Sequence, residues 1–185
     1  MKKSLGPRTI PFPAPVWVIG SYDAAGRPNM MTASWVGICC SRPPCIAVSL
    51  RRQRYSYANL VARGAFTISV PSIEHVKVVD YWGIVSGRDE EKLARSGLST
   101  ARSDLVDAPY VPTFPAVMEC RVRHTLELGS HTQFVGEILD VKVDEALLGP
   151  NGQPDFDRLG LFVYADEYRA VGGIVAQAFT IGKEI

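Results

Sequence analysis

Two long strand candidates joined by a very short turn constrain this chain more than any other feature of its sequence. The candidates cover residues 116–129 and 132–147, and both are rich in β-branched and other apolar residues. Between them lies only the turn Gly129–Ser130–His131. A turn this short joins strands that lie next to each other, so the sequence predicts β-sheet at the centre of the fold.

Shorter strand candidates flank this pair on both sides. Each is bounded by turn residues, and together they cover residues 16–23, 45–52, 66–72 and 159–173. The first runs into Ala24, Ala25 and Gly26, which predicts a hairpin, and the last is predicted to bend near Ala165–Asp166. The sequence therefore predicts six or more strands.

Helical patterns are confined to the middle of the chain. Residues 54–64 are predicted to form a helix that Ser56 caps and Gly64 stops. From 72 to 97 the apolar spacing is again helical and ends in a short helix with acids in its first turn. Proline-rich and glycine-rich loops are predicted over residues 109–115 and 149–157.

Strands separated by turns, with one helical insertion, favour a β-barrel over an alternating strand–helix sheet. The predicted fold class is mainly β with a helical insertion. No internal repeat or domain boundary is visible, so residues 1–185 are predicted to form a single domain.

The composition argues against several classes of partner. Hydrophobic residues make up 46% of the chain and charged residues 21%, which is ordinary for a globular protein. A formal net charge of +1 argues against nucleic acid, and no apolar run is long enough to span a bilayer. Near the N-terminus Arg8 and several prolines interrupt any signal-peptide core, so a cytoplasmic location without membrane attachment is expected.

The four cysteines, at positions 39, 40, 45 and 120, form no C-x-x-C pair, and the histidines are not at zinc-ligand spacing. No metal site is predicted, and the cysteines are expected to be buried free thiols. A redox pair at Cys39–Cys40 is the alternative.

Familiar catalytic motifs are missing. The sequence contains no G-x-G, Walker A loop, G-x-S-x-G or H-E-x-x-H pattern, and no histidine is placed between a nucleophile and an acid. If the protein is an enzyme, its reactive atoms are expected to belong to a bound cofactor.

One segment suits a phosphate. A phosphate requires backbone N–H groups, hydroxyls and cations, best supplied near a helix N-terminus. The run "SLRRQRYSY", residues 49–57, offers the end of a strand, three arginines and the start of a helix. The alternative interpretation is a solvated, charged strand end.

A second segment suits an aromatic ring system. In "NMMTASW", residues 29–35, an extended chain places Met31, Ala33 and Trp35 on one face and the hydroxyls of Thr32 and Ser34 on the other. A flat ring could then lie against the tryptophan while short polar groups meet its edge. A plain strand with a buried tryptophan and solvent-facing hydroxyls fits this segment equally well.

Six segments in order resemble the flavin reductase-like, FMN-binding split-barrel family, and most closely its flavoredoxin branch. They are "GSYDAAGRPNMMTASWVG", "PPCIAVSLRRQRYSYANL", "FTISVPS", "DYWGIVSGRDEEKL", "ELGSHTQFVGEI" and "GGIVAQAFTIGK". The resemblance covers about residues 13–183. It implies a homodimer of Greek-key split β-barrels with one FMN per subunit, at or near the dimer interface.

The resemblance also assigns residues to the flavin. The ring and ribityl chain are expected beside Asn29, Thr32, Ala33, Ser34 and Trp35. The ribityl and phosphate path is expected along Ser49, Leu50, Arg51, Arg54, Tyr55, Ser56 and Lys92. Near the flavin the resemblance further implies Tyr164 and His131, and His131 is the one candidate catalytic residue, because an imidazole can sense or stabilise charge on a reduced flavin.

Three functions follow as hypotheses. The first is an oxidoreductase that passes hydride from NADH or NADPH through FMN to a free flavin or a partner protein. The second is a flavoredoxin-type electron carrier that holds FMN tightly and uses nicotinamide poorly. The third is a β-barrel binding module without a redox role.

Overall fold

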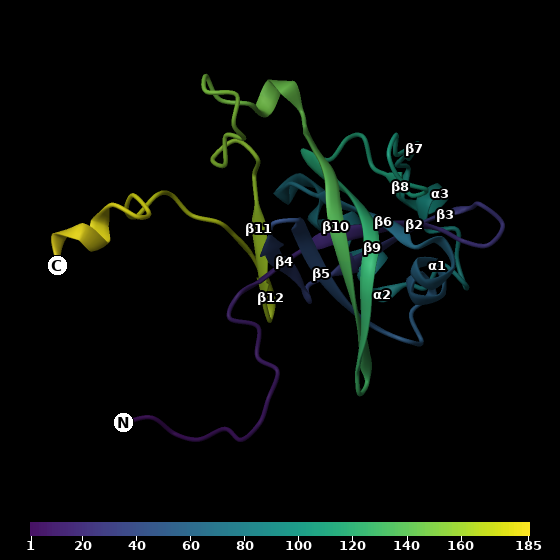
Figure 1. The fold of residues 1–185 in the computed structure, drawn as a ribbon, viewed down its shortest axis with the longest axis horizontal. Coiled ribbons are helices and arrows are strands. Elements are labelled where there is room, and N and C mark those ends of the chain that lie inside the picture. Colours follow the sequence, from purple (N-terminus) through teal and green to yellow (C-terminus); the bar gives the residue numbers. More distant parts are fainter.

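Strands dominate the architecture, as the turn-rich sequence predicts. The computed structural model describes residues 1–185, apart from the side chain of residue 184. Seven antiparallel strands form the main sheet in the order β3-β2-β6-β9-β10-β5-β4 (Figure 1). Their bounds are β2 Trp17–Tyr22, β3 Pro28–Ala33, β4 Val36–Ser41, β5 Pro44–Arg51, β6 Ala65–Val70, β9 Ala116–Leu128 and β10 His131–Val143.

The predicted central pair of long strands is confirmed as the hairpin β9–β10. The two strands pair from His131 opposite Leu128 at the turn to Val143 opposite Ala116 at the far end. The turn is shorter than expected, because only Gly129 and Ser130 lie outside the strands and His131 already begins β10. Gly129 takes a φ of 70°, a left-handed conformation that glycine adopts without strain.

The main sheet curls around a shared core. Alternate residues of β5, Ile46, Val48 and Leu50, pack in one cluster with Met31 of β3, although β3 and β5 lie near opposite ends of the strand order. Among the described residues no ladder joins β3 to β4, so hydrogen bonds do not close the sheet into a barrel. The chain itself crosses between these two edge strands in two residues, Ser34 and Trp35.

Helix α1, Tyr55–Arg63, follows β5 directly and differs from its prediction at one end. Gly64 ends it in a left-handed conformation, with its N–H donating to the carbonyl of Leu60, as expected. The predicted cap by Ser56 is wrong, because the helix already begins at Tyr55 and Arg54 occupies the cap position without a side-chain bond. Ser56 is instead buried in the first turn.

The helical pattern over residues 72–97 divides into several short elements. They are η1 Ile73–His75, α2 Val76–Ile84 and α3 Lys92–Ser96. The predicted acidic first turn of the last helix is wrong, because the acids precede Lys92, where α3 begins. Val79 and Trp82 of α2 are fully buried against Met30 of β3 in a second core cluster.

Smaller elements complete the fold. β1 Ala14–Pro15 pairs with β11 Phe162–Ala165, which pairs with β12 Glu167–Ala170, and β7 Ala101–Arg102 pairs with β8 Pro109–Tyr110. The remaining 3₁₀ turns are η2 Glu145–Leu147 and η3 Ile181–Glu184.

The predicted single strand over residues 159–173 is wrong. The expected bend is a full reversal at Asp166, which has a φ of 61° and sets Tyr164 opposite Tyr168. The Tyr168 hydroxyl donates to Asp80 of α2 at 2.7 Å, which fastens the β11–β12 hairpin to the helical layer.

The cysteines divide into two environments. Cys45 and Cys120 are buried free thiols, as expected, whereas Cys39 and Cys40 are exposed, so burial is wrong for this pair. Their strand, β4, is an edge strand whose hairpin end no other strand covers.

Both ends of the chain extend away from the sheets on the side of β11 and β12 (Figure 1). Within the described part of the chain, no helix combines the length and the apolar character needed to cross a membrane.

Candidate functional site

Two adjoining cavities open along the gap between β3 and the end of β5. The larger has a volume of about 660 Å³ and the smaller about 270 Å³. They share three lining residues, Met31, Arg51 and Arg54, so they lie side by side.

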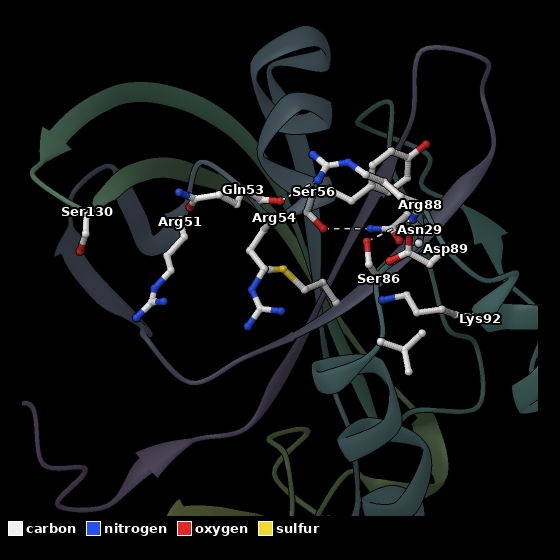
Figure 2. A pocket seen from close by; sticks show the side chains of 14 residues that line it. Asn29, Arg51, Gln53, Arg54, Ser56, Ser86, Arg88, Asp89, Lys92 and Ser130 are labelled. Atoms are coloured by element: carbon white, nitrogen blue, oxygen red, sulfur yellow. Dashed lines mark hydrogen bonds between the residues drawn. The ribbon is translucent and has the colours of Figure 1, made fainter.

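Cations surround the larger cavity. Arg51 and Arg54 come from the link between β5 and α1, while Arg88 and Lys92 come from the segment before and within α3. In Figure 2, Arg51 and Arg54 point the same way and the Lys92 amine points toward Ser86. Asp89 is the single acid in this lining. The cavity therefore suits an anion.

Lys92 is the unusual member of this group because its side chain is buried. Only 5% of the residue is exposed, and its Nζ donates to the carbonyl of Trp82 at 3.1 Å. Burial, together with the nearby charge of Arg54, lowers the pKa of Lys92 to about 8. A buried amine with one carbonyl partner has donors left for a ligand in the cavity.

Asn29 and Ser56 lie at the inner wall of the same cavity. The Asn29 amide donates to the Ser56 hydroxyl at 2.9 Å, and both residues are buried (Figure 2). Gly87 approaches them so closely that a Cβ there would lie 2.3 Å from Asn29 Oδ1 and 3.0 Å from Tyr55 Cδ1. Only glycine fits at this position, because any side chain would displace the amide.

Tyr55 is turned toward a neighbouring acid. Its hydroxyl donates to Asp23 at 2.8 Å, and Arg27 also binds this carboxylate at 2.8 Å. Burial alone raises the pKa of Asp23, but hydrogen bonds from Arg27 and Tyr55 outweigh it and lower the pKa to about 2. Arg88 lies over the Tyr55 ring at 5.7 Å. This network fixes the start of α1 against the turn between β2 and β3.

An aromatic pair marks the smaller cavity. Trp35 and His131 have ring centroids 4.5 Å apart at an interplanar angle of 30°, and Trp35 remains 46% exposed. The His131 Nδ1 lies 2.9 Å from the Ser130 hydroxyl, and the Ser49 N–H donates to the Trp35 carbonyl at 2.9 Å. A flat ligand could therefore meet an indole and an imidazole at one edge of this cavity.

The extended conformation expected for residues 29–35 ends before Trp35. β3 ends at Ala33, and Ser34 and Trp35 form a bend that leads into β4. The Thr32 hydroxyl donates to the carbonyl of Val79 in α2, so this group already has a partner inside the protein. The indole reaches the cavity because the chain turns there.

All of the residues that the sequence analysis assigned to the flavin line one or both cavities. The larger holds Asn29, Arg51, Arg54, Tyr55, Ser56 and Lys92. The smaller holds Thr32, Ala33, Ser34, Trp35, Ser49, Leu50, Arg51, Arg54, His131 and Tyr164. Residues more than a hundred positions apart therefore meet around these two adjoining cavities.

Several lining residues were not assigned from the sequence. They are Met31, Gln53, Val85, Ser86, Gly87, Arg88, Asp89 and Ser130. The Ser86–Gly87–Arg88 run was a visible signal, because it places a small residue and a cation just before Lys92.

The donor set of the two cavities is suited to binding a ligand. It offers cations, amide and hydroxyl groups and an aromatic edge, and in the described residues no cluster of His, Cys, Asp or Glu could hold a metal ion. The residues fit a ligand with an anionic tail and a flat ring.

Comparison with known proteins gives a consistent result. A family model described as "Flavin reductase like domain" matches residues 8–172. The structure is similar to flavoredoxin of Desulfovibrio vulgaris (Miyazaki F), with 50% identity, a TM-score of 0.93, and coverage of 98% of this chain and 100% of that one. Flavoredoxin from Methanosarcina acetivorans is 28% identical with a TM-score of 0.92, covering 100% and 98% of the two chains.

A curated relative is a component of a larger enzyme system. The reductase component of an FADH(2)-dependent resorcinol hydroxylase from a Rhizobium strain is 28% identical over 147 residues, which covers 77% of this chain and 79% of that protein.

Proposed function

Because the chain belongs to the flavin reductase-like family, we propose that it binds FMN in the two adjoining cavities and transfers electrons through it. The observation that carries this proposal is the pairing of a cation-lined cavity, which includes the buried Lys92, with a cavity edged by Trp35 and His131. An FMN molecule has the matching pair of features, a phosphate at one end and a flat ring at the other.

The residues of the larger cavity would hold the phosphate. Arg51, Arg54 and Lys92 supply positive charge, and charge-assisted hydrogen bonds of this kind are about twice as strong as neutral ones. Because Lys92 is buried, its charge is less screened by water than that of a surface lysine. Asn29 and Ser56 offer polar atoms to the ribityl chain from the inner wall.

The residues of the smaller cavity would orient the ring. Trp35 offers an apolar face, and His131 places a ring nitrogen where it can donate to or accept from the ligand. Flavin chemistry supplies the redox step, in which a hydride or single electrons are accepted and passed on. The protein supplies binding, orientation and partial exclusion of water.

Two assignments within this function can be separated by experiment. The first is an NAD(P)H:flavin oxidoreductase, which the family match and the similarity to a hydroxylase reductase component support. The second is an electron carrier with firmly held FMN, which the 50% identity to a flavoredoxin supports. We propose the first as the activity and keep the carrier as the alternative.

The deciding experiment is an absorbance titration of the purified protein after gel filtration in the presence of FMN. A flavin spectrum that stays with the protein and is bleached by NADH or NADPH supports the oxidoreductase. A retained spectrum that only a reduced electron-transfer protein bleaches supports the carrier. A colourless protein that leaves FMN fluorescence unchanged would contradict both.

We further propose that residues 1–185 act as one flavin-binding domain of split-barrel type that assembles as a homodimer in the cytoplasm. Exposed apolar side chains of the C-terminal segment, Ile174, Val175 and Phe179, offer surface for a second copy. Sedimentation equilibrium tests this directly, because a monomer mass at micromolar concentration would contradict it.

A further inference from the structure

Three cysteines lie at the turn end of the β4–β5 hairpin, and none of them lines either flavin cavity. Cys40 of β4 lies directly opposite Cys45 of β5 in the antiparallel ladder. The register shifts between Ile38 and Cys40, so β4 carries a bulge there and Cys39 is the extra residue beside the pair. The chain therefore places two thiols opposite each other and a third next to them.

The position of Cys40 and Cys45 suits a disulfide. Directly opposite residues of an antiparallel pair project from the same face, with Cβ atoms about 4.5 to 5.5 Å apart. A disulfide requires Cα atoms about 4.4 to 6.8 Å apart and Cβ atoms slightly closer than an ordinary pair, which a small adjustment of an end hairpin supplies. Adjacent Cys39 and Cys40 have no such arrangement, because neighbours along a strand point to opposite faces unless the bulge redirects them.

The two sulfurs of the pair differ in access. Cys40 is exposed, and its Sγ lies 3.5 Å from the carbonyl oxygen of Arg42 in the turn. Cys45 is only 6% exposed, and burial raises the pKa of its thiol, with further increases from the nearby sulfurs of Cys40 and Cys39. An oxidant therefore reaches Cys40 first.

Charged groups of the neighbouring strands also face this site. Glu137 of β10 lies opposite Cys45 in the ladder and raises the pKa of the Cys45 thiol, while Arg123 of β9 lowers it. Arg123 donates to Glu137 at 2.6 Å, so the two charges largely offset each other. Burial remains the largest influence on the pKa of the Cys45 thiol.

We propose that Cys40 and Cys45 form a redox-active dithiol that a hydroperoxide converts to a cross-strand disulfide. The Cys40 thiolate attacks one peroxide oxygen, so that an S–O bond forms, the O–O bond breaks, and the remaining oxygen leaves as an alcohol or, from hydrogen peroxide, as water. The Cys45 sulfur then attacks the Cys40 sulfur; an S–S bond forms, the S–O bond breaks, and the hydroxyl leaves as water with the thiol proton. The dithiol loses two electrons and the peroxide gains them.

A disulfide between Cys40 and Cys45 would add a covalent bond at one edge of the main sheet. Among the described strands β4 pairs only with β5, so it forms one edge of the main sheet. Joining Cys40 to Cys45 adds a cross-strand bond beside the short turn that already links β4 to β5, and β5 continues to Ser49 and Arg51 at the flavin cavities. The proposal stands whether or not FMN binds, because none of these cysteines lines either cavity.

The test treats the full-length, reduced protein with stoichiometric hydrogen peroxide and then alkylates the remaining thiols under denaturing conditions. Intact mass spectrometry should show that two of the four thiols are lost without added oxygen, and that a dithiol reductant restores them. Retention of all four thiols, or oxygen adducts alone, would overturn the proposal.

Matched variants assign the bond. Cys40→Ser should abolish it, whereas Cys39→Ser, at the adjacent exposed position, and Cys120→Ser should leave it unchanged. Cys45→Ser should also abolish it, but Cys45 is buried and its replacement can disturb the fold, so the exposed Cys40→Ser carries the test. A disulfide that survives in Cys40→Ser, or disappears in Cys39→Ser, would place the bond elsewhere and overturn the assignment.

Discussion

Lys92 Nζ donates to the carbonyl oxygen of Trp82 at 3.1 Å, and the Trp82 indole in turn lies 3.5 Å from the carbonyl of Lys92. This reciprocal contact joins the start of α3 to the buried end of α2 beneath the larger cavity. It holds a single amine in a partly desolvated position in the wall of that cavity.

The affinity for FMN should depend on pH through Lys92. Its pKa of about 8 in the free protein means that the amine is charged below that pH and neutral above it. A bound phosphate favours the charged amine. The affinity for FMN should therefore be greatest below about pH 8. It should fall as the pH rises further, because binding then requires the neutral amine to take up a proton. Fluorescence titrations of FMN between about pH 7 and pH 9.5 measure this. Riboflavin, which lacks the phosphate, serves as the control, and Lys92→Met should remove the dependence.

Arg51→Ala should weaken FMN binding by about 1 to 3 kcal/mol, the range for loss of a charge-assisted hydrogen bond. The neighbouring Arg52 provides a matched control, because it pairs with Glu127 on the surface and lines neither cavity. Isothermal titration of both variants gives the comparison. Equal affinities for Arg51→Ala and Arg52→Ala would mean that the phosphate lies elsewhere.

Gly87→Ala should disturb the inner wall of the larger cavity. The added Cβ would lie 2.3 Å from Asn29 Oδ1, so the amide must move and its bond to Ser56 is lost. We expect FMN binding to weaken by about 1 to 3 kcal/mol, because buried polar groups lose their partners. Gly37→Ala is the control, since nothing lies within 4 Å of a Cβ at that position. A Gly87→Ala protein with unchanged affinity would contradict the close packing described here.

Acid stability should depend on Asp23. A carboxyl whose folded pKa is lowered stabilises the fold above its unfolded pKa, and this contribution is lost as the pH falls through the folded value. For Asp23 the window runs from about pH 4 down to about pH 2. Allowing for solvent screening on the Arg27 side, Asp23→Asn should cost about 1 to 2 kcal/mol near neutral pH and much less at pH 2. Urea unfolding at several pH values measures this, with the exposed Asp157→Asn as control.

Much of the fold follows from local sequence patterns. β2, β5, β6 and the long hairpin are visible because β-branched and apolar residues alternate between turn residues, and Gly64 and Gly97 end helices at the expected places. The predictions that failed concern two helix starts, one strand and the burial of Cys39 and Cys40. Arg54 rather than Ser56 caps α1 because Ser56 binds Asn29, a residue of another strand that no local pattern reveals.

The candidate site, like the fold, could be predicted only in part from the sequence. Segments 29–35 and 49–57 are recognisable alone, but their meeting depends on the curl of the sheet, which is a property of the whole fold. The burial of Lys92 illustrates the point, because a lysine among Glu and Arg residues is typical of a solvated helix face. Packing against Trp82, ten residues earlier, places it in the cavity wall.

The two-residue crossing at Ser34 and Trp35 has a mechanical consequence. The first and last strands of the main sheet, β3 and β4, share no ladder in the described structure; this short piece of backbone joins them directly, and both pack against the same core. A cut or a long insertion there would remove the short covalent link between the two edge strands and leave the shared core to maintain the curl of the sheet. Because Trp35 is part of this crossing, the aromatic edge of the smaller cavity is positioned by the same backbone that joins the two edge strands.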